Sequence, residues 1–198
     1  WFGLNWDSVS VKIVNQTIDR ALTFLEDPQA RAKALADRDP EAVFLALWAV
    51  AFEDALAAIP VAAGLLEHKR VEVRYVAAVH LSQLALPQTQ AVRAKALDDE
   101  DLRVALCALT GSGWDEGEAE ELEGSDGLFE RLQRLFDRLP AKPIVLKPLV
   151  WPWTERKASR EEIAWHLVQA LGKRPPTMLI PYLPAIKAWH RRSVVQRW

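Results

Sequence analysis

The segment Arg31-Ala-Lys-Ala-Leu35 recurs letter for letter as Arg93-Ala-Lys-Ala-Leu97, at an offset of 62 along the chain. In this register nine of the seventeen positions from 31 to 47 are identical to their counterparts from 93 to 109. A third copy lies halfway between them, where Ala63 and Leu66 match Ala32 and Leu35 at half of that offset. Self-similarity at a fixed period of about 20 to 50 residues is typical of repeat proteins. The sequence therefore predicts three copies of a 31-residue unit.

Each unit predicts two short helices joined by a polar turn. The first helix of the middle copy places apolar residues three and four positions apart, at Leu56, Ile59, Ala63 and Leu66, and this spacing indicates one buried helical face. Such a pair is too small to cover its own apolar surface, whereas stacking against the next pair covers it. The predicted fold is therefore all-α, an α-α superhelix, with its repeats in residues 1–110.

The turns carry the signals that start the second helix of each unit. Their sequences are Asp37-Arg-Asp39, His68-Lys-Arg70 and Asp98-Asp-Glu-Asp101. A carboxylate here can accept hydrogen bonds from the free N–H groups of the next helix and complements its dipole. Pro40 supports the same boundary, because proline at the first helical position loses no hydrogen bond. The other prolines expected to mark helix boundaries are Pro28, Pro60 and Pro87.

Two stretches resemble the HEAT-repeat signature, in which a polar turn precedes a Val-Arg pair and a helix of alanines and leucines. They are His68-Lys-Arg-Val-Glu-Val-Arg-Tyr-Val-Ala-Ala-Val-His-Leu81 and Asp99-Glu-Asp-Leu-Arg-Val-Ala-Leu-Cys-Ala-Leu109. A 31-residue unit is shorter than a full HEAT repeat of about 40 to 47 residues, so the resemblance is to the compact HEAT-like class. In that family an arginine bridges the polar turns of adjacent repeats. The resemblance implies this structural role for Arg74 and Arg103, while the first copy has Val43 near that position.

Residues 111–127 differ sharply from the repeats, with seven acids and no base. Such a run is typical of an exposed loop; the alternative is that it docks on a basic part of the chain or keeps an anionic ligand away from it.

Residues 128–198 are expected to form a diverged helical region that caps or links the repeats. Helices are predicted over 126–139, from Ser159 to about Leu171, and after Pro175-Pro176. Between them, the proline-rich residues 140–158 predict an extended segment, with a short strand as the alternative.

Half of the 198 residues are hydrophobic, which is enough for a sizeable core. The formal charge is −2, but residues 1–140 carry −10 and residues 141–198 carry +8. This balance argues against a dedicated nucleic-acid binder, and no stretch approaches the ~18 to 20 apolar residues of a membrane span. The single Cys107 predicts a buried thiol. A cytoplasmic protein is expected, and the start at Trp1 suggests a piece of a longer one.

Tryptophan is unusually frequent, with nine residues, and several lie near cations in the C-terminal part. The candidate partner-binding residues are Trp151, Trp153, Arg156, Lys157, Trp189, Arg191 and Arg192. Aromatic rings beside cations can hold a protein partner or stack on bases, but they more often seal a core. The four histidines, His68, His80, His166 and His190, have no metal-ligand spacing, and no phosphate loop or nucleophile elbow occurs. No catalytic residue, metal or cofactor is therefore predicted.

The leading hypothesis is a HEAT-like scaffold that binds a protein partner on the surface of its stacked helices. The resemblance also allows an enzyme on the same scaffold, since some HEAT-like proteins are alkylpurine DNA glycosylases and others attach bilins to phycobiliproteins. The basic C-terminal part fits a glycosylase, whereas the acidic repeats do not. A third hypothesis is a structural segment that links a repeat array to a downstream domain of a larger protein.

Overall fold

The described residues of the computed structural model form two compact units, the first ending at His80 and the second beginning at Leu81. This boundary lies inside a helix, far from the change in composition at residue 111. The acidic loop, apart from Gly127, lies outside the described residues. The structure describes residues 11–37, 39–84, 86–109, 127–146, 156–160, 163–164, 166–167, 180 and 183–194; side chains are not described at 11–14, 145–146, 156–158, 190 and 192–194.

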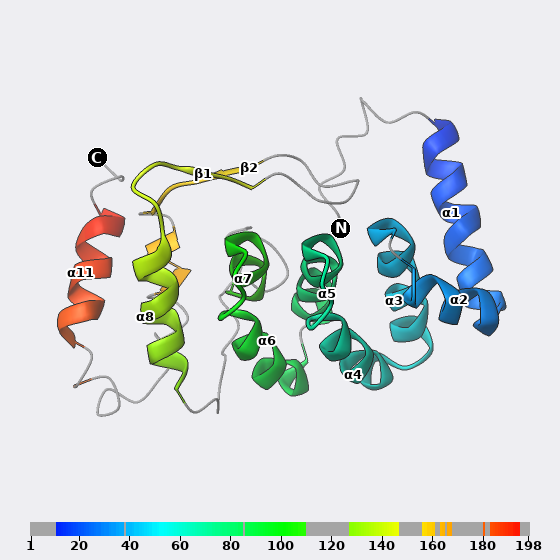
Figure 1. Cartoon of the computed structure of the whole chain (residues 1–198), viewed down its shortest axis with the longest axis horizontal. Coiled ribbons are helices and arrows are strands. Elements are labelled where there is room, and N and C mark those ends of the chain that lie inside the picture. Colours follow the sequence, from blue (N-terminus) through cyan, green and yellow to red (C-terminus); the bar gives the residue numbers. More distant parts are fainter. Residues whose placement is uncertain are drawn as a thin grey trace. The chain divides into compact units, whose positions relative to one another are not determined.

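The first unit is built from helices alone in its described residues. They are α1 (Val11–Glu26), α2 (Pro28–Leu35), α3 (Pro40–Glu53), α4 (Ala55–Leu65) and the part of α5 (Val71–Leu84) that ends at His80 (Figure 1). Phe24 of α1 and Ala34 of α2 pack in one buried cluster with Ala42, Ala46 and Ala49 of α3. Alanines along α3 leave room for the two preceding helices to approach it closely.

The second unit is also mainly helical, but it contains one small sheet. Its elements after α5 are η2 (Pro87–Thr89), α6 (Gln90–Ala96), α7 (Leu102–Leu109), α8 (Leu128–Arg138), β1 (Ile144–Leu146), β2 (Arg156–Ala158) and α11 (Leu183–Val194) (Figure 1). Strands β1 and β2 pair antiparallel, with Val145 opposite Lys157. The described residues are thus predominantly helical as predicted, and at 144–146 the alternative of a short strand is the one observed.

The helix starts follow the repeat period of the sequence. The second helix of each pair begins at Pro40, Val71 and Leu102, which are evenly spaced by one period. The first helices, α2, α4 and α6, are capped at their C-terminal ends by Ala36, Leu66 and Leu97. The three predicted helix pairs are therefore present, each with its turn at the same place in the repeat.

The turns share one hydrogen bond that recurs with the same period. The side chains of Asp37, His68 and Asp99 each accept a bond from the backbone N–H two residues later, at 3.1, 3.1 and 2.8 Å. His68 uses its Nδ1 atom where the other two turns use a carboxylate oxygen. A ring nitrogen thus replaces the aspartate as the acceptor that shapes the turn.

This equivalence leads to a prediction for His68. Replacing His68 by Ala removes the turn acceptor and is expected to lower the free energy of unfolding by about 1 kcal/mol. His68→Asp restores the residue of the other two repeats and is expected to change it by less than about 0.5 kcal/mol. Urea denaturation followed by circular dichroism measures both. Equal losses in the two variants would show that the acceptor does not hold the turn.

Arg74 and Arg103 were expected to occupy the same position in their repeats, and this expectation is wrong. Counted by the repeat period, Arg103 corresponds to Glu72 and Arg74 corresponds to Ala105. Arg74 is buried and donates to the carbonyl oxygens of His68 and Lys69 in its own turn, at 3.1 and 3.4 Å. Arg103 forms an ion pair with Asp101 at 2.6 Å. Each arginine thus makes these contacts within its own turn.

Two sequence expectations for α4 are also corrected. Pro28, Pro40 and Pro87 begin their helices as predicted, but Pro60 lies inside α4. Ile59 is buried as expected, whereas Leu56 is 55% exposed. Every residue of α4 is apolar, so its pattern lacks the contrast that would show which face points inward.

The predicted helix over 126–139 is confirmed as α8, with Leu128, Leu132, Leu135 and Phe136 buried. Gly127 begins it with a φ of 76°, a left-handed conformation that favours glycine. The described residues between 160 and 167 are helical, in agreement with the helix predicted from Ser159. The last helix among the described residues is α11, which starts at Leu183; Pro175 and Pro176, where a helix was predicted to open, lie outside the described residues.

Candidate functional surface

The candidate residues of the C-terminal part are not gathered into a described site. Trp151 and Trp153 lie outside the described residues. Arg156 and Lys157 lie in β2, opposite Leu146 and Val145, and Arg192 lies in α11, but their side chains are among those not described.

Arg191 is exposed on α11, but Trp189 of the same helix is fully buried. The Trp189 ring stacks on Phe129 at 5.3 Å between centroids and packs on Phe136 at 5.6 Å. The guanidinium of Arg160 lies 4.8 Å from the centre of the Phe136 ring and donates to the Phe136 carbonyl oxygen at 3.5 Å. Trp189 therefore belongs to the aromatic core between α8 and α11, and the placement of its ring rules out a direct contact with a partner.

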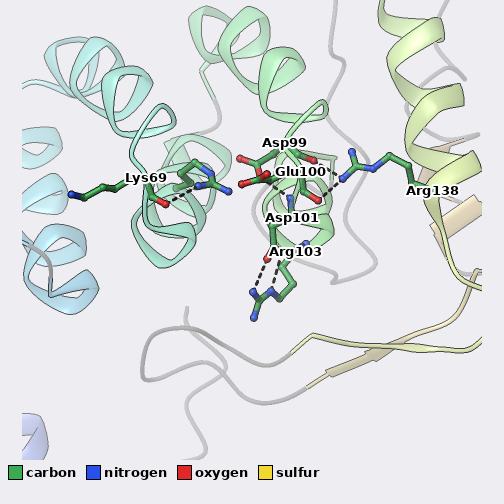
Figure 2. A network of polar contacts seen from close by, with 7 residues as sticks. Lys69, Asp99, Glu100, Asp101, Arg103 and Arg138 are labelled. Atoms are coloured by element: carbon green, nitrogen blue, oxygen red, sulfur yellow. Dashed lines mark hydrogen bonds and ion pairs between the residues drawn. The ribbon is translucent and has the colours of Figure 1, made fainter.

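Three arginines of α8 reach the polar turn before α7. Arg131 and Arg134 both pair with the carboxylate of Asp98, and the second of these distances is 2.7 Å. Arg138 donates to the carbonyl oxygens of Asp99 and Glu100 at 2.6 and 2.7 Å (Figure 2). Spacings of three and four residues put these arginines on one side of α8. They join α8 to the third repeat and so have a structural role.

His80 of α5 is fully buried, and neither ring nitrogen has a hydrogen-bond partner within the described part of the chain. Its ring meets Trp48 of α3 edge to face, at 5.5 Å between centroids and 88° between planes. Burial lowers the pKa of His80 from 6.5 to about 4, because the charged form would lose its hydration. The imidazole is thus held neutral in the helical core.

The first unit exposes four large apolar side chains: Ile18 and Leu22 of α1, Phe52 of α3 and Leu56 of α4. Leu56, Ala57, Pro60 and Gly64 are all exposed, and their spacing places them on one side of the helix. We refer to these four residues as the α4 face. Phe52, just before the Asp54 turn that separates α3 from α4, is 80% exposed.

The other two repeats show what normally occupies these positions. Ala57, Pro60 and Gly64 correspond, by the repeat period, to Glu26, Gln29 and Lys33 in the first copy and to Gln88, Ala91 and Lys95 in the third. All nine residues are exposed. Burial therefore does not explain why the middle repeat has no polar side chain at these three positions. These positions hold three polar residues in the first copy, two polar residues and an alanine in the third, and no polar residue on α4.

The α4 face also exposes its backbone. A Cβ atom built on Gly64 would have no atom within 4 Å, so the space above this residue is open. Pro60 has no N–H group and gives no helical hydrogen bond to the carbonyl of Leu56. Charged residues lie at both ends of α4: Glu53 and Asp54 precede it, and Glu67, Lys69 and Arg70 follow it. Glu53 pairs with Arg31 at 2.7 Å, and this hydrogen bond lowers the pKa of Glu53.

This surface was not among the predicted sites, although the sequence contains its signal. Aligning the three copies shows that Gly64 stands where the others have lysine and that Pro60 stands inside a helix. The tryptophans and cations of the sequence favoured a binding site in the C-terminal part instead. In the described residues no cluster of three His, Cys, Asp or Glu side chains could bind a metal, and no described helix is long and apolar enough to cross a membrane.

Comparisons with known proteins give a family but no activity. Neither the curated proteins nor the solved structures contain a significant match to the chain. A family model does match, and it covers residues 1–196. The chain therefore belongs to a family of unknown function, DUF5724.

Proposed function

We propose that this chain is a HEAT-like repeat scaffold that binds a protein partner through the α4 face. Three helix pairs with equivalent turns support a stacked array, in which each pair covers the apolar side of the next. The observation that carries the binding role is the contrast between repeats: the exposed positions that hold Glu, Gln and Lys in the first copy hold Ala, Pro and Gly in the second. A contiguous exposed apolar patch is typical of a site that binds a partner.

The test uses a variant that copies the first repeat onto the second. Pro60→Gln/Gly64→Lys replaces both residues with those found at positions 29 and 33. The change is expected to raise the free energy of unfolding by at least about 0.5 kcal/mol, because it removes glycine and proline from a helix interior. Loss of binding in this variant therefore cannot be attributed to loss of fold.

Wild type and variant are immobilised side by side and used to capture proteins from the native cell extract. A specific partner is expected to be retained by the wild type and reduced at least tenfold by Pro60→Gln/Gly64→Lys, the loss expected for about 1.4 kcal/mol of contact. The control Gln29→Ala/Lys33→Ala removes the polar side chains from the corresponding positions of α2. It is expected to leave capture unaltered. Capture of the same proteins in equal amounts by the wild type and the α4 variant would contradict the proposal.

A further inference from the structure

We propose that one side of α1 is covered by a further repeat helix, the counterpart of α2 and α4, which lies N-terminal to α1 in the same polypeptide. This side holds Asn15, Ile18 and Leu22, which are spaced by three and four residues along the helix. We refer to these three residues as the outer face of α1. The covering helix is independent of any partner that binds the α4 face.

The outer face of α1 is exposed at positions that the later repeats bury. Helix α1 lies one repeat period before α3, so it occupies the place of a second helix. Ile18 is 49% exposed, whereas its counterpart Ala49 is 3% exposed. Asn15 is exposed as well, and its counterparts Ala46 and Ala77 are fully buried. Helix α1 therefore has the position of an inner helix without the neighbour that covers one.

The later repeats show what covers these positions. Ala46 and Ala49 of α3 pack in one buried cluster with Phe24 of α1 and Ala34 of α2. His80, the next counterpart of Ala49, meets a ring of the preceding second helix, α3. The corresponding side of a second helix thus packs on the helices that come before it in the chain. By this equivalence the outer face of α1 receives the first helix of its own repeat.

The sequence before α1 continues the repeat. Counted by the period, Leu4 stands at the position of Leu35, Leu66 and Leu97. Among the described helices, α3, α5 and α7 each follow a first helix in the chain. The same register places a helix of this kind before α1, although residues 1–10 lie outside the described residues.

The covering helix is expected to present small residues to α1. In the buried cluster the alanines of α3 face the large Phe24, whereas on the outer face of α1 the large residues are Ile18 and Leu22. Close packing against them favours alanine or glycine on the other helix. Gly3 meets this condition, because it stands where α2 has the buried Ala34.

Size argues for a helix of the same polypeptide over a second copy of the chain. Ile18 and Leu22 are 49% and 48% exposed, and two such side chains fall far short of the ~800 Å² that each partner of a stable dimer covers. A helix joined to α1 by a short connection needs less contact, since the connection keeps it at a high effective concentration.

The test measures how fast a thiol reagent reaches α1 in the complete natural polypeptide. Ile18→Cys is compared with Lys33→Cys, which is exposed on α2, and peptide mass spectrometry reads each site separately. We expect the thiol at position 18 to react about tenfold or more slowly than the thiol at position 33, because the covering helix must open first. In the chain of residues 1–198 the two thiols should react at similar rates.

A pair of neighbouring substitutions tests the register of the covering helix. Leu4→Asp, added to Ile18→Cys in the complete polypeptide, puts a charge where α2 has Leu35 and should speed labelling about threefold or more. Asn5→Asp adds the same charge where the counterpart Ala36 is exposed, and it should leave labelling unchanged. Circular dichroism checks that both variants keep their helices.

The remaining outcomes would overturn the proposal. Equal labelling at positions 18 and 33 of the complete polypeptide would show that nothing covers the outer face of α1. Protection that Leu4→Asp leaves intact would mean that another segment lies there. Protection that disappears on dilution would identify a second copy of the protein. Capture of a partner through the α4 face is measured separately, so either proposal can fail without the other.

Discussion

Replacing Trp189 by alanine is expected to lower the free energy of unfolding by about 3 to 5 kcal/mol, the usual cost of removing a large buried aromatic side chain. The residue is fully buried and contacts Phe129 and Phe136 of α8, so its loss leaves a cavity between α8 and α11. Urea denaturation followed by circular dichroism measures the change.

The matched control is Lys187→Ala, which shortens an exposed side chain on the same helix and should change the free energy of unfolding by less than about 0.5 kcal/mol. Trp189→Phe keeps an aromatic ring and should cost less than the alanine variant. If Trp189→Ala were as stable as Lys187→Ala, the tryptophan would have to lie on the surface, as the partner-binding hypothesis from the sequence required.

Lowering the pH is expected to destabilise the fold through His80. The pKa of this residue is about 4 in the folded chain, below the 6.5 that is usual for histidine. Above pH 6.5 both the folded and the unfolded states are neutral at this position, and His80 adds no pH dependence. Below pH 6.5 the unfolded state binds a proton that the folded state excludes. The free energy of unfolding should therefore fall as the pH drops towards 4, by about 3 kcal/mol in total.

Wild type and His80→Leu are compared by urea denaturation at pH 7, 5.5 and 4.5. The leucine removes two ring nitrogens that make no hydrogen bond among the described residues, so it should be tolerated at pH 7. The stability difference in favour of the variant should grow as the pH falls, since only the wild type carries the buried imidazole. A difference that stays constant over this range would refute the role of His80.

Short-range signals were sufficient to predict the helix pairs. Asp39 caps α3 and Asp101 accepts from the N–H of Arg103, and such bonds depend only on residues within a few positions of each other. The repeat period then placed each pair. The prediction failed where the HEAT-like motif and the repeat period give different alignments. The Val-Arg motif suggested that Arg74 and Arg103 are equivalent residues. The spacing between them, however, is two positions shorter than the repeat period.

Contacts between distant segments explain the rest of what the sequence did not reveal. His80 is buried beside Trp48 of another helix, and nothing in its own segment indicates this. Trp189 is buried, as tryptophans of such a segment more often are, but the cations around it in the sequence do not show that its ring faces α8. The outward side of α4 could not be predicted because all its residues are apolar; only coordinates distinguish buried Ile59 from exposed Leu56.

The ion pairs of the second and third turns suggest how the number of repeats can change. Arg70 pairs with Glu72 at 3.3 Å, and at the corresponding positions of the next turn Asp101 pairs with Arg103 with the charges exchanged. Each pair is complete within three consecutive residues, so duplication or deletion of one whole repeat would take both charges with it. Evolution could therefore lengthen or shorten such a protein by whole units without leaving either pair broken, and could alter one unit, such as that of α4, while its neighbours stay the same.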